Sequence, residues 1–103
     1  MSIPRALLVA LPVVMLAMSA AEARDIENAC NKSSRRGVSS SLCGCIQSVA
    51  DQTLTGRGDQ KLAAKFFADP QMAQDIRQSE RRSHEAFWQR YRLFGATAQQ
   101  KCS

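Results

Sequence analysis

Four cysteines constrain the fold of this 103-residue chain more than any other feature of its sequence. Cys43 and Cys45 stand one residue apart near the middle of the chain, Cys30 precedes them, and Cys102 is the last residue but one. A small domain buries little surface relative to the entropy that its chain loses on folding, so covalent links commonly compensate. Each disulfide typically adds about 2–4 kcal/mol of stability. We therefore interpret all four cysteines as structural disulfide partners.

The residues around the cysteine pair predict a helix, which limits how the four cysteines can be paired. Side chains at helical spacing predict one buried face, made by Leu42, Cys45, Ile46, Val49 and Thr53. Residues two positions apart on a helix point in different directions, so a bond between Cys43 and Cys45 is geometrically poor. Cys30 and Cys102 should therefore each bond one member of the pair. The spacing leaves open which bonds which.

The first 23 residues have the layout of a secretory signal peptide. Arg5 gives a short positive start, residues 6–18 are apolar, and small residues then lead to Ala23. We expect cleavage after Ala23, with Ala21 as the alternative. A single transmembrane anchor is the competing interpretation, but the apolar run is shorter than the roughly 20 residues that a helix needs to cross a bilayer. The prediction is an exported protein, periplasmic or extracellular, with one small helical domain at residues 24–103 and no transmembrane span within it.

The pattern of the exported domain predicts an all-α fold, a small disulfide-linked bundle of three to four helices with a short C-terminal turn. A first helix is expected over Asp25–Lys32, followed by a polar loop at 33–41 whose last serines can cap the second helix. Gly56 is expected to end the second helix in a left-handed conformation. Asp59 is the expected N-cap of a third helix, whose predicted buried side is Leu62, Ala63, Phe66 and Phe67.

The segment after Asp69 predicts one long helix. Proline fits the first turn of a helix, and Asp69 before it can serve as the cap. No glycine or proline interrupts the chain from there to Phe94, and a periodic stripe runs along it, namely Met72, Ile76, Ser79, Ser83, Phe87, Tyr91 and Phe94. Gly95 is expected to end this helix. Residues 96–101 should then form a short turn that returns Cys102 to the bundle.

The same long helix carries the candidate partner-binding residues. A second stripe recurs at spacings of four, three, four and four, on a side separate from the buried one: Arg77, Arg81, His84, Trp88 and Arg92. Arginine beside an aromatic ring suits a phosphate, a carboxylate or an acidic protein surface. The competing interpretation is an ordinary solvated face, with Trp88 half-buried at its margin and Arg81 paired to Glu85.

The charge of the chain narrows the expected partner. A net charge of +5 is modest for nucleic-acid binding, and nucleic acid is an unusual target outside the cytoplasm. We expect no nucleic-acid partner, and an anionic envelope component or an acidic protein fits better. A homodimer is a further interpretation, because Trp88 and Leu93 are candidates for exposed apolar surface. The predicted function is therefore that of an interaction or accessory module.

Catalytic and cofactor chemistry has little support in the sequence. A thiol–disulfide redox protein that uses Cys43 or Cys45 is the main alternative, since closely spaced thiols can exchange disulfides with partners. The cysteine spacings match no common zinc pattern. His84, the only histidine, lies four residues after Glu80, as in a surface pair. We assign no catalytic residue, no metal ligand and no cofactor, and an enzyme is the less favoured class.

A set of short motifs spans nearly the whole of residues 24–103: Cys30, Leu42-Cys43-Gly44-Cys45-Ile46-Gln47, Asp59-Gln60, Phe66-Phe67, Asp69-Pro70, Arg82-Ser83-His84-Glu85, Phe87-Trp88, Phe94-Gly95 and Cys102. Together these motifs resemble a family of short exported proteins from alphaproteobacteria, for which "arginine transporter" is a common label. The resemblance implies export. A domain without membrane spans cannot form a translocation path, so the label implies at most a small-ligand-binding component of a transport system. A ligand pocket of several hundred Å³ is not expected in so small a bundle.

Overall fold

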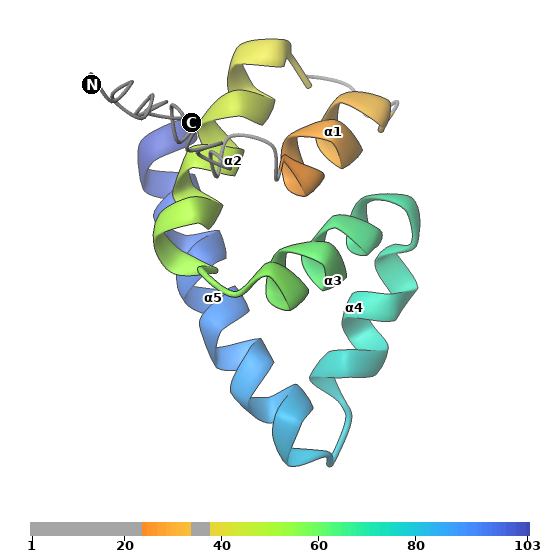
Figure 1. Ribbon diagram of the computed structural model, residues 1–103. Coiled ribbons are helices and arrows are strands. Elements are labelled where there is room, and N and C mark those ends of the chain that lie inside the picture. The colour runs from red at the N-terminus through yellow and green to blue at the C-terminus, as the bar shows by residue number, and fades with distance from the viewer. Residues whose placement is uncertain (1–23, 34–37) are drawn as a thin grey trace, which may run out of the picture.

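The computed structural model describes residues 24–33 and 38–103, and within these ranges the chain forms five helices and no strand (Figure 1). The helices are α1 (Asp25–Lys32), α2 (Ser40–Thr53), α3 (Arg57–Ala68), α4 (Pro70–Arg77) and α5 (Arg82–Cys102). The all-α class is confirmed, and the helix count exceeds the three to four that the sequence predicts. The expected signal peptide lies outside the described residues.

The helices surround one hydrophobic core. α2 contacts α1 and α5, α3 contacts α1 and α4, and α4 contacts α5, so the series of packed pairs closes on itself. Figure 1 shows α4 and α5 meeting in a turn at one end of the molecule, while α2 lies beside the other end of α5. Each helix contributes to the buried cluster, which consists of Ile26, Val49, Ala50, Leu54, Ala63, Phe66, Ile76, Phe87 and Phe94.

The first helix matches its predicted bounds, but the buried side of α2 is shifted from the predicted one: Val49 is buried, whereas Leu42, Cys45, Ile46 and Thr53 are only partly buried. The side-chain oxygen of Ser39 accepts a hydrogen bond from the Leu42 N–H at 3.1 Å, which confirms a serine cap. Cys43, at the edge of the predicted face, and Ala50, outside it, are fully buried. The reason is that α2 packs between two neighbours, with α1 on one side and α5 on the other.

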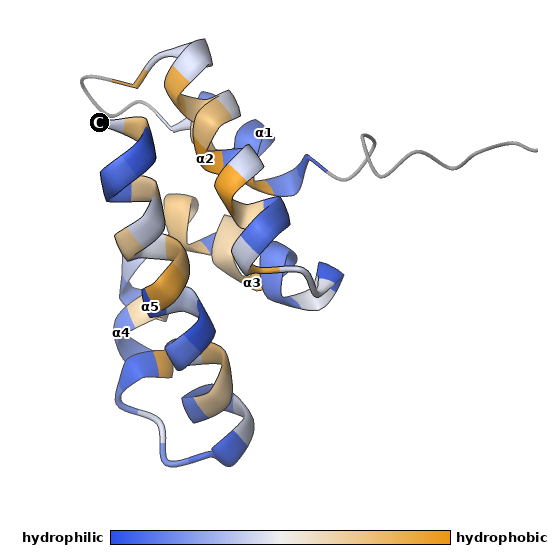
Figure 2. Ribbon diagram, turned by 90° about the vertical axis from the view of Figure 1, so that its left-hand side faces the viewer, coloured by the Kyte–Doolittle hydropathy of each residue, from blue (hydrophilic) through white to orange (hydrophobic). Residues whose placement is uncertain are grey.

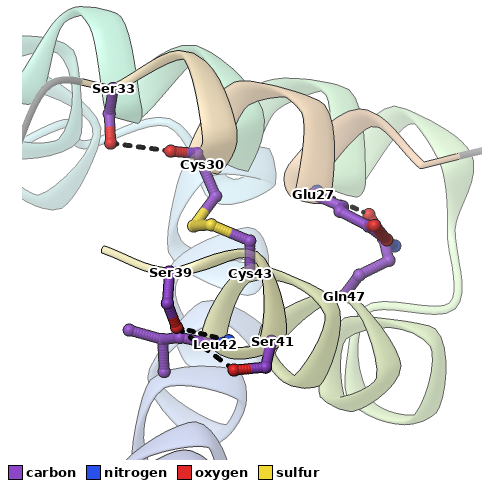
Figure 3. The surroundings of a disulfide bond; sticks show 8 residues. All are labelled: Glu27, Cys30, Ser33, Ser39, Ser41, Leu42, Cys43 and Gln47. Atoms are coloured by element: carbon purple, nitrogen blue, oxygen red, sulfur yellow. Dashed lines mark hydrogen bonds between the residues drawn. A yellow bond between two sulfur atoms is a disulfide. The ribbon is translucent and has the colours of Figure 1, made fainter. Parts of the chain in front are cut away.

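A buried hydrogen-bond network joins the first three helices, and the sequence analysis did not predict it. Gln47 Nε2 donates to Gln60 Oε1 at 2.8 Å and to Asp51 Oδ1 at 2.9 Å. The Glu27 N–H donates to Gln47 Oε1 at 2.9 Å (Figure 3). Arg24, the N-cap residue of α1, makes no side-chain cap hydrogen bond. Gln47, which belongs to α2, therefore accepts a hydrogen bond from a backbone N–H in the first turn of α1. A side chain at the N-cap position normally accepts such a bond.

The predicted boundary between the second and third helices is wrong at two residues. α2 ends at Thr53, and Gly56 has φ −75° and ψ 130°, an extended conformation, as the N-cap residue of α3. Asp59 lies within the first turn of α3. Its carboxylate pairs with Arg90 of α5 instead of capping its own helix, so a contact between helices decides its role.

The predicted long helix is also wrong, because the chain breaks at residues 78–81 into α4 and α5. No large apolar side chain lies between Ile76 and Phe87, so this stretch loses no buried surface by leaving the helix. Figure 2 shows the turn as hydrophilic. Folding back lets α4 pack on α3 and α5. The Ser79 Oγ accepts a hydrogen bond from the Arg81 N–H at 3.2 Å, which is the local competition by which serine disfavours helix interiors.

The predicted stop at Gly95 is wrong as well, because α5 continues through it to Cys102. Residues 96–101 belong to this helix, which delivers Cys102 to α2 as expected. An interior glycine costs a helix about 0.5–1 kcal/mol relative to alanine. A Cβ added at Gly95 would meet no atom within 4 Å. The sequence pattern could not show that the disulfide and the packing of α5 outweigh this cost.

Replacing Gly95 with alanine is therefore expected to raise the free energy of unfolding by about 0.5–1 kcal/mol. Urea denaturation followed by far-ultraviolet circular dichroism measures this change. Gly56→Ala is the matched control, because Gly56 lies outside the helix interior as an N-cap residue. A loss of stability in Gly95→Ala would contradict a continuous α5.

In the described part of the chain, no helix is long and apolar enough to span a membrane.

Candidate functional site

The two disulfides hold the ends of the domain to α2. Cys30 of α1 bonds Cys43, and Cys45 bonds Cys102 at the end of α5. This pairing confirms that Cys43 and Cys45 do not bond each other. Figure 3 shows the first disulfide between α1 and α2, where both cysteines are buried. Cys45 and Cys102 are partly exposed, and none of the four cysteines is a free thiol.

The break at residues 78–81 divides the candidate partner-binding residues between two helices. Arg77 is the last residue of α4, and Arg81 is the N-cap residue of α5. His84, Trp88 and Arg92 follow at intervals of four within α5, which places them on one side of it. We call these five residues the basic-aromatic face. Helical spacing within α5 therefore aligns only His84, Trp88 and Arg92, whereas Arg81 precedes the helix in an extended conformation and Arg77 belongs to α4.

His84 stabilises the turn between α4 and α5. Its Nδ1 lies 2.7 Å from the Ser79 Oγ, which also accepts the Arg81 N–H. The Nδ1 of neutral His84 can accept a hydrogen bond from the Ser79 hydroxyl, and protonated His84 can donate a hydrogen bond to the same oxygen. The contact is therefore compatible with either charge state. The expected side-chain pair with Glu80 is not among the hydrogen bonds and ion pairs of the described residues.

Trp88 is the half-buried centre of the face. It packs against the core, and its ring centroid lies 5.1 Å from that of Tyr91. Tyr91 in turn contacts Phe66, Phe87 and Phe94 through their rings. This aromatic cluster fixes the indole against the core and leaves part of it at the surface.

The arginines of the face have no carboxylate partner among the described residues. Arg77, Arg81 and Arg92 are exposed. The two ion pairs in the described ranges, at distances up to 4.0 Å, join Arg24 to Glu27 and Arg90 to Asp59. The pair between Arg81 and Glu85, which the competing interpretation requires, does not form. Three guanidinium groups, on α5 and at the turn before it, thus lack a carboxylate partner within the described ranges.

Arg90, by contrast, is an arginine whose guanidinium group forms an ion pair within the fold. Its Nε donates to Asp59 Oδ2 at 2.6 Å and its terminal nitrogen to Oδ1 at 3.1 Å, a bidentate link between α5 and α3. The hydrogen bond that Arg90 donates to Asp59 raises the pKa of Arg90, burial opposes this more weakly, and the negative charge of Asp59 adds a smaller increase. Arg90 is therefore committed to the fold, in contrast to the arginines of the basic-aromatic face.

A cavity of about 480 Å³, open to solvent, lies between α1 and α3, which is more space than the sequence leads us to expect in so small a bundle. Its lining combines apolar side chains (Ala29, Ala64, Phe67), basic ones (Lys61, Lys65) and polar or acidic ones such as Asp25. A signal was present in the sequence, because these residues repeat at helical spacing along both helices. Those spacings predict each helix separately and do not show that the two faces meet around a cavity.

In the ranges 24–33 and 38–103, no group of three or more histidine, cysteine or acidic side chains is placed to hold a metal ion. Comparison of the chain with protein-family models, with curated proteins and with solved structures finds no match.

Proposed function

We propose that this protein is a small exported binding module that docks an anionic partner, best matched by an acidic protein surface, through its basic-aromatic face. One observation carries the proposal: Arg92, one helical turn from a tryptophan fixed against the core, and Arg77 and Arg81, at the turn that leads into the same helix, are exposed and have no carboxylate partner in the described residues. Two disulfides in a small domain are compatible with export, because such bonds persist in oxidising compartments.

The chemistry of the face favours carboxylates. A guanidinium group binds a carboxylate through two parallel hydrogen bonds, and arginine is less strongly hydrated than lysine. Tryptophan and arginine are also the residues most enriched among those that dominate binding energy at protein interfaces. The indole of Trp88 loses little further freedom on binding, because Tyr91 already contacts it.

The test starts from a partner recovered by copurification from the native cell envelope. We expect Arg81→Ala combined with Arg92→Ala to weaken its binding at least tenfold, since an arginine that dominates an interface costs more than about 1 kcal/mol when it is truncated. Trp88 is the only tryptophan, so its fluorescence emission reports binding at the face directly.

Arg57→Ala combined with Lys101→Ala is the matched control, because it removes the same charge at exposed positions outside the face. The control should bind as tightly as the unmodified protein. Equal weakening in both double variants would show attraction by net charge alone. Unchanged affinity in Arg81→Ala/Arg92→Ala would contradict the proposal.

A thiol–disulfide redox function is the second candidate, and the partly exposed Cys45–Cys102 bond favours it over one at Cys43. The Cys43 sulfur is buried and bonded to Cys30, out of reach of a partner thiol. A redox role for Cys45 requires that mild reductant opens its bond reversibly while the fold persists.

A further inference from the structure

The cavity between α1 and α3 lies outside the basic-aromatic face and has the dimensions of a ligand site. Its volume of about 480 Å³ falls within the roughly 300–1,000 Å³ typical of small-molecule pockets. Both helices that form it are tied into the fold, α1 through the Cys30–Cys43 disulfide and α3 through the Asp59–Arg90 pair. The cavity is therefore built from fixed elements.

Small side chains on facing stripes create this space. Four lining residues of α1 occupy positions 25, 28, 29 and 32, and four of α3 occupy positions 61, 64, 65 and 68. Both sets follow the i, i+3, i+4, i+7 spacing of one helix face. Alanine stands at positions 29, 64 and 68, where larger side chains would fill the space between the helices. The ring of Phe67, which packs against the core, adds an apolar wall.

The charged residues of the lining are predominantly basic. Lys32, Lys61 and Lys65 are exposed, and none of them forms an ion pair within the described ranges. Asp25 is the only carboxylate of the lining. Three ammonium groups against one carboxylate leave this cavity with an excess of positive charge beside its apolar floor.

We propose that the α1–α3 cavity binds a small anionic amphiphile, a molecule with one acidic head group and a compact apolar body. The alanines and Phe67 accept the apolar body, because its burial removes apolar surface from water. The lysines interact with the head group at the open rim, where ammonium groups keep part of their hydration. A neutral amphiphile lacks the attraction to the lysines, and a simple anion lacks the burial of an apolar body.

Titration of the exported domain with decanoate, below the concentration at which it forms micelles, tests this proposal. Calorimetry should show saturable binding at one site per chain, and at least tenfold weaker binding of acetate, which supplies the head group alone, and of decanol, which supplies the body alone. Backbone amide resonances that shift on titration should belong mainly to α1 and α3. Binding that requires lipid vesicles, or decanol binding as tight as that of decanoate, would overturn the proposal.

Variants separate the two interactions. Lys61→Gln with Lys65→Gln should weaken decanoate binding about three- to tenfold and reduce its dependence on salt, as expected for partly exposed charges. Ala64→Leu should weaken it at least tenfold by filling the cavity. The matched controls, Lys101→Gln and Ala86→Leu, change the same residue types at exposed positions of α5 and should leave affinity unchanged.

The lysine variants keep the test decisive if Ala64→Leu fails to fold, since they alter only exposed side chains. Unchanged affinity in the lysine double variant would contradict the proposal. Arg81→Ala/Arg92→Ala should bind decanoate normally, so the result here is independent of the result for the basic-aromatic face.

Discussion

Replacing Phe66 with alanine is expected to lower the free energy of unfolding by about 3–5 kcal/mol. Phe66 is 5% exposed. Its ring meets those of Phe87 and Tyr91 edge to face, with centroids 6.0 and 5.2 Å apart. Alanine would leave a cavity where α3 meets α5 and would remove both ring contacts, which add to the loss of buried area. Urea denaturation followed by far-ultraviolet circular dichroism measures the change.

Phe67→Ala is the matched control for this prediction. Phe67 neighbours Phe66 on the same helix but is only partly buried, since it also lines the α1–α3 cavity. Its removal should cost about 1–2 kcal/mol, in proportion to the smaller area that it buries. Equal losses in the two variants would show that neither the deeper burial of Phe66 nor its ring contacts add stability. A loss below about 1 kcal/mol for Phe66→Ala would contradict its place in the core.

The sequence predicts most elements of the fold because their signals are local. The first helix matches Asp25–Lys32, and a serine before the second helix caps it. The impossibility of a bond between Cys43 and Cys45 also follows from local helix geometry. Asp59 shows the limit, because its role depends on Arg90, which lies 31 residues further along the chain.

The break between α4 and α5 marks a second limit. Helix-breaking residues are absent there, so the pattern alone favours continuity, whereas the fold gains by packing Ile76 of α4 into the core. Tertiary contacts of this kind override local propensity. An absence of large apolar residues between Ile76 and Phe87 is the signal in the sequence that indicates the turn.

In the candidate site, too, the sequence predicts what depends on local spacing and misses what depends on tertiary contacts. The spacing from His84 to Arg92 is local and lies on one side of α5, whereas Arg81 precedes the helix. The contacts of these residues depend on parts of the chain that are distant in sequence. The aromatic cluster determines whether the Trp88 side chain is fixed. The carboxylates that other helices place near an arginine determine whether it forms an ion pair. The α1–α3 cavity depends on how two separate stripes face each other, which no single stretch of sequence specifies.

Removal of the Cys45–Cys102 disulfide by paired serine substitutions is expected to cost about 4 kcal/mol of stability. The two cysteines are 57 residues apart, and in the chain-entropy model a crosslink restricts the unfolded chain more as the closed loop lengthens. Both side chains are partly exposed, so serine adds little penalty of its own. The loss is large for a domain this small, in which a hydrophobic core alone supplies only about 3–5 kcal/mol.

The dependence of unfolding on urea distinguishes this mechanism from a loss of packing. Without the crosslink the unfolded chain expands and exposes more surface, so the urea m-value should rise along with the fall in stability. Cys30→Ala with Cys43→Ala is the comparison, because those cysteines are only 13 residues apart. Its m-value should rise less, whatever packing is lost at the buried sulfurs. An unchanged m-value in the Cys45 and Cys102 variant would show that this bond does not act through the unfolded chain, and that contacts between α2 and the end of α5 account for the stability instead.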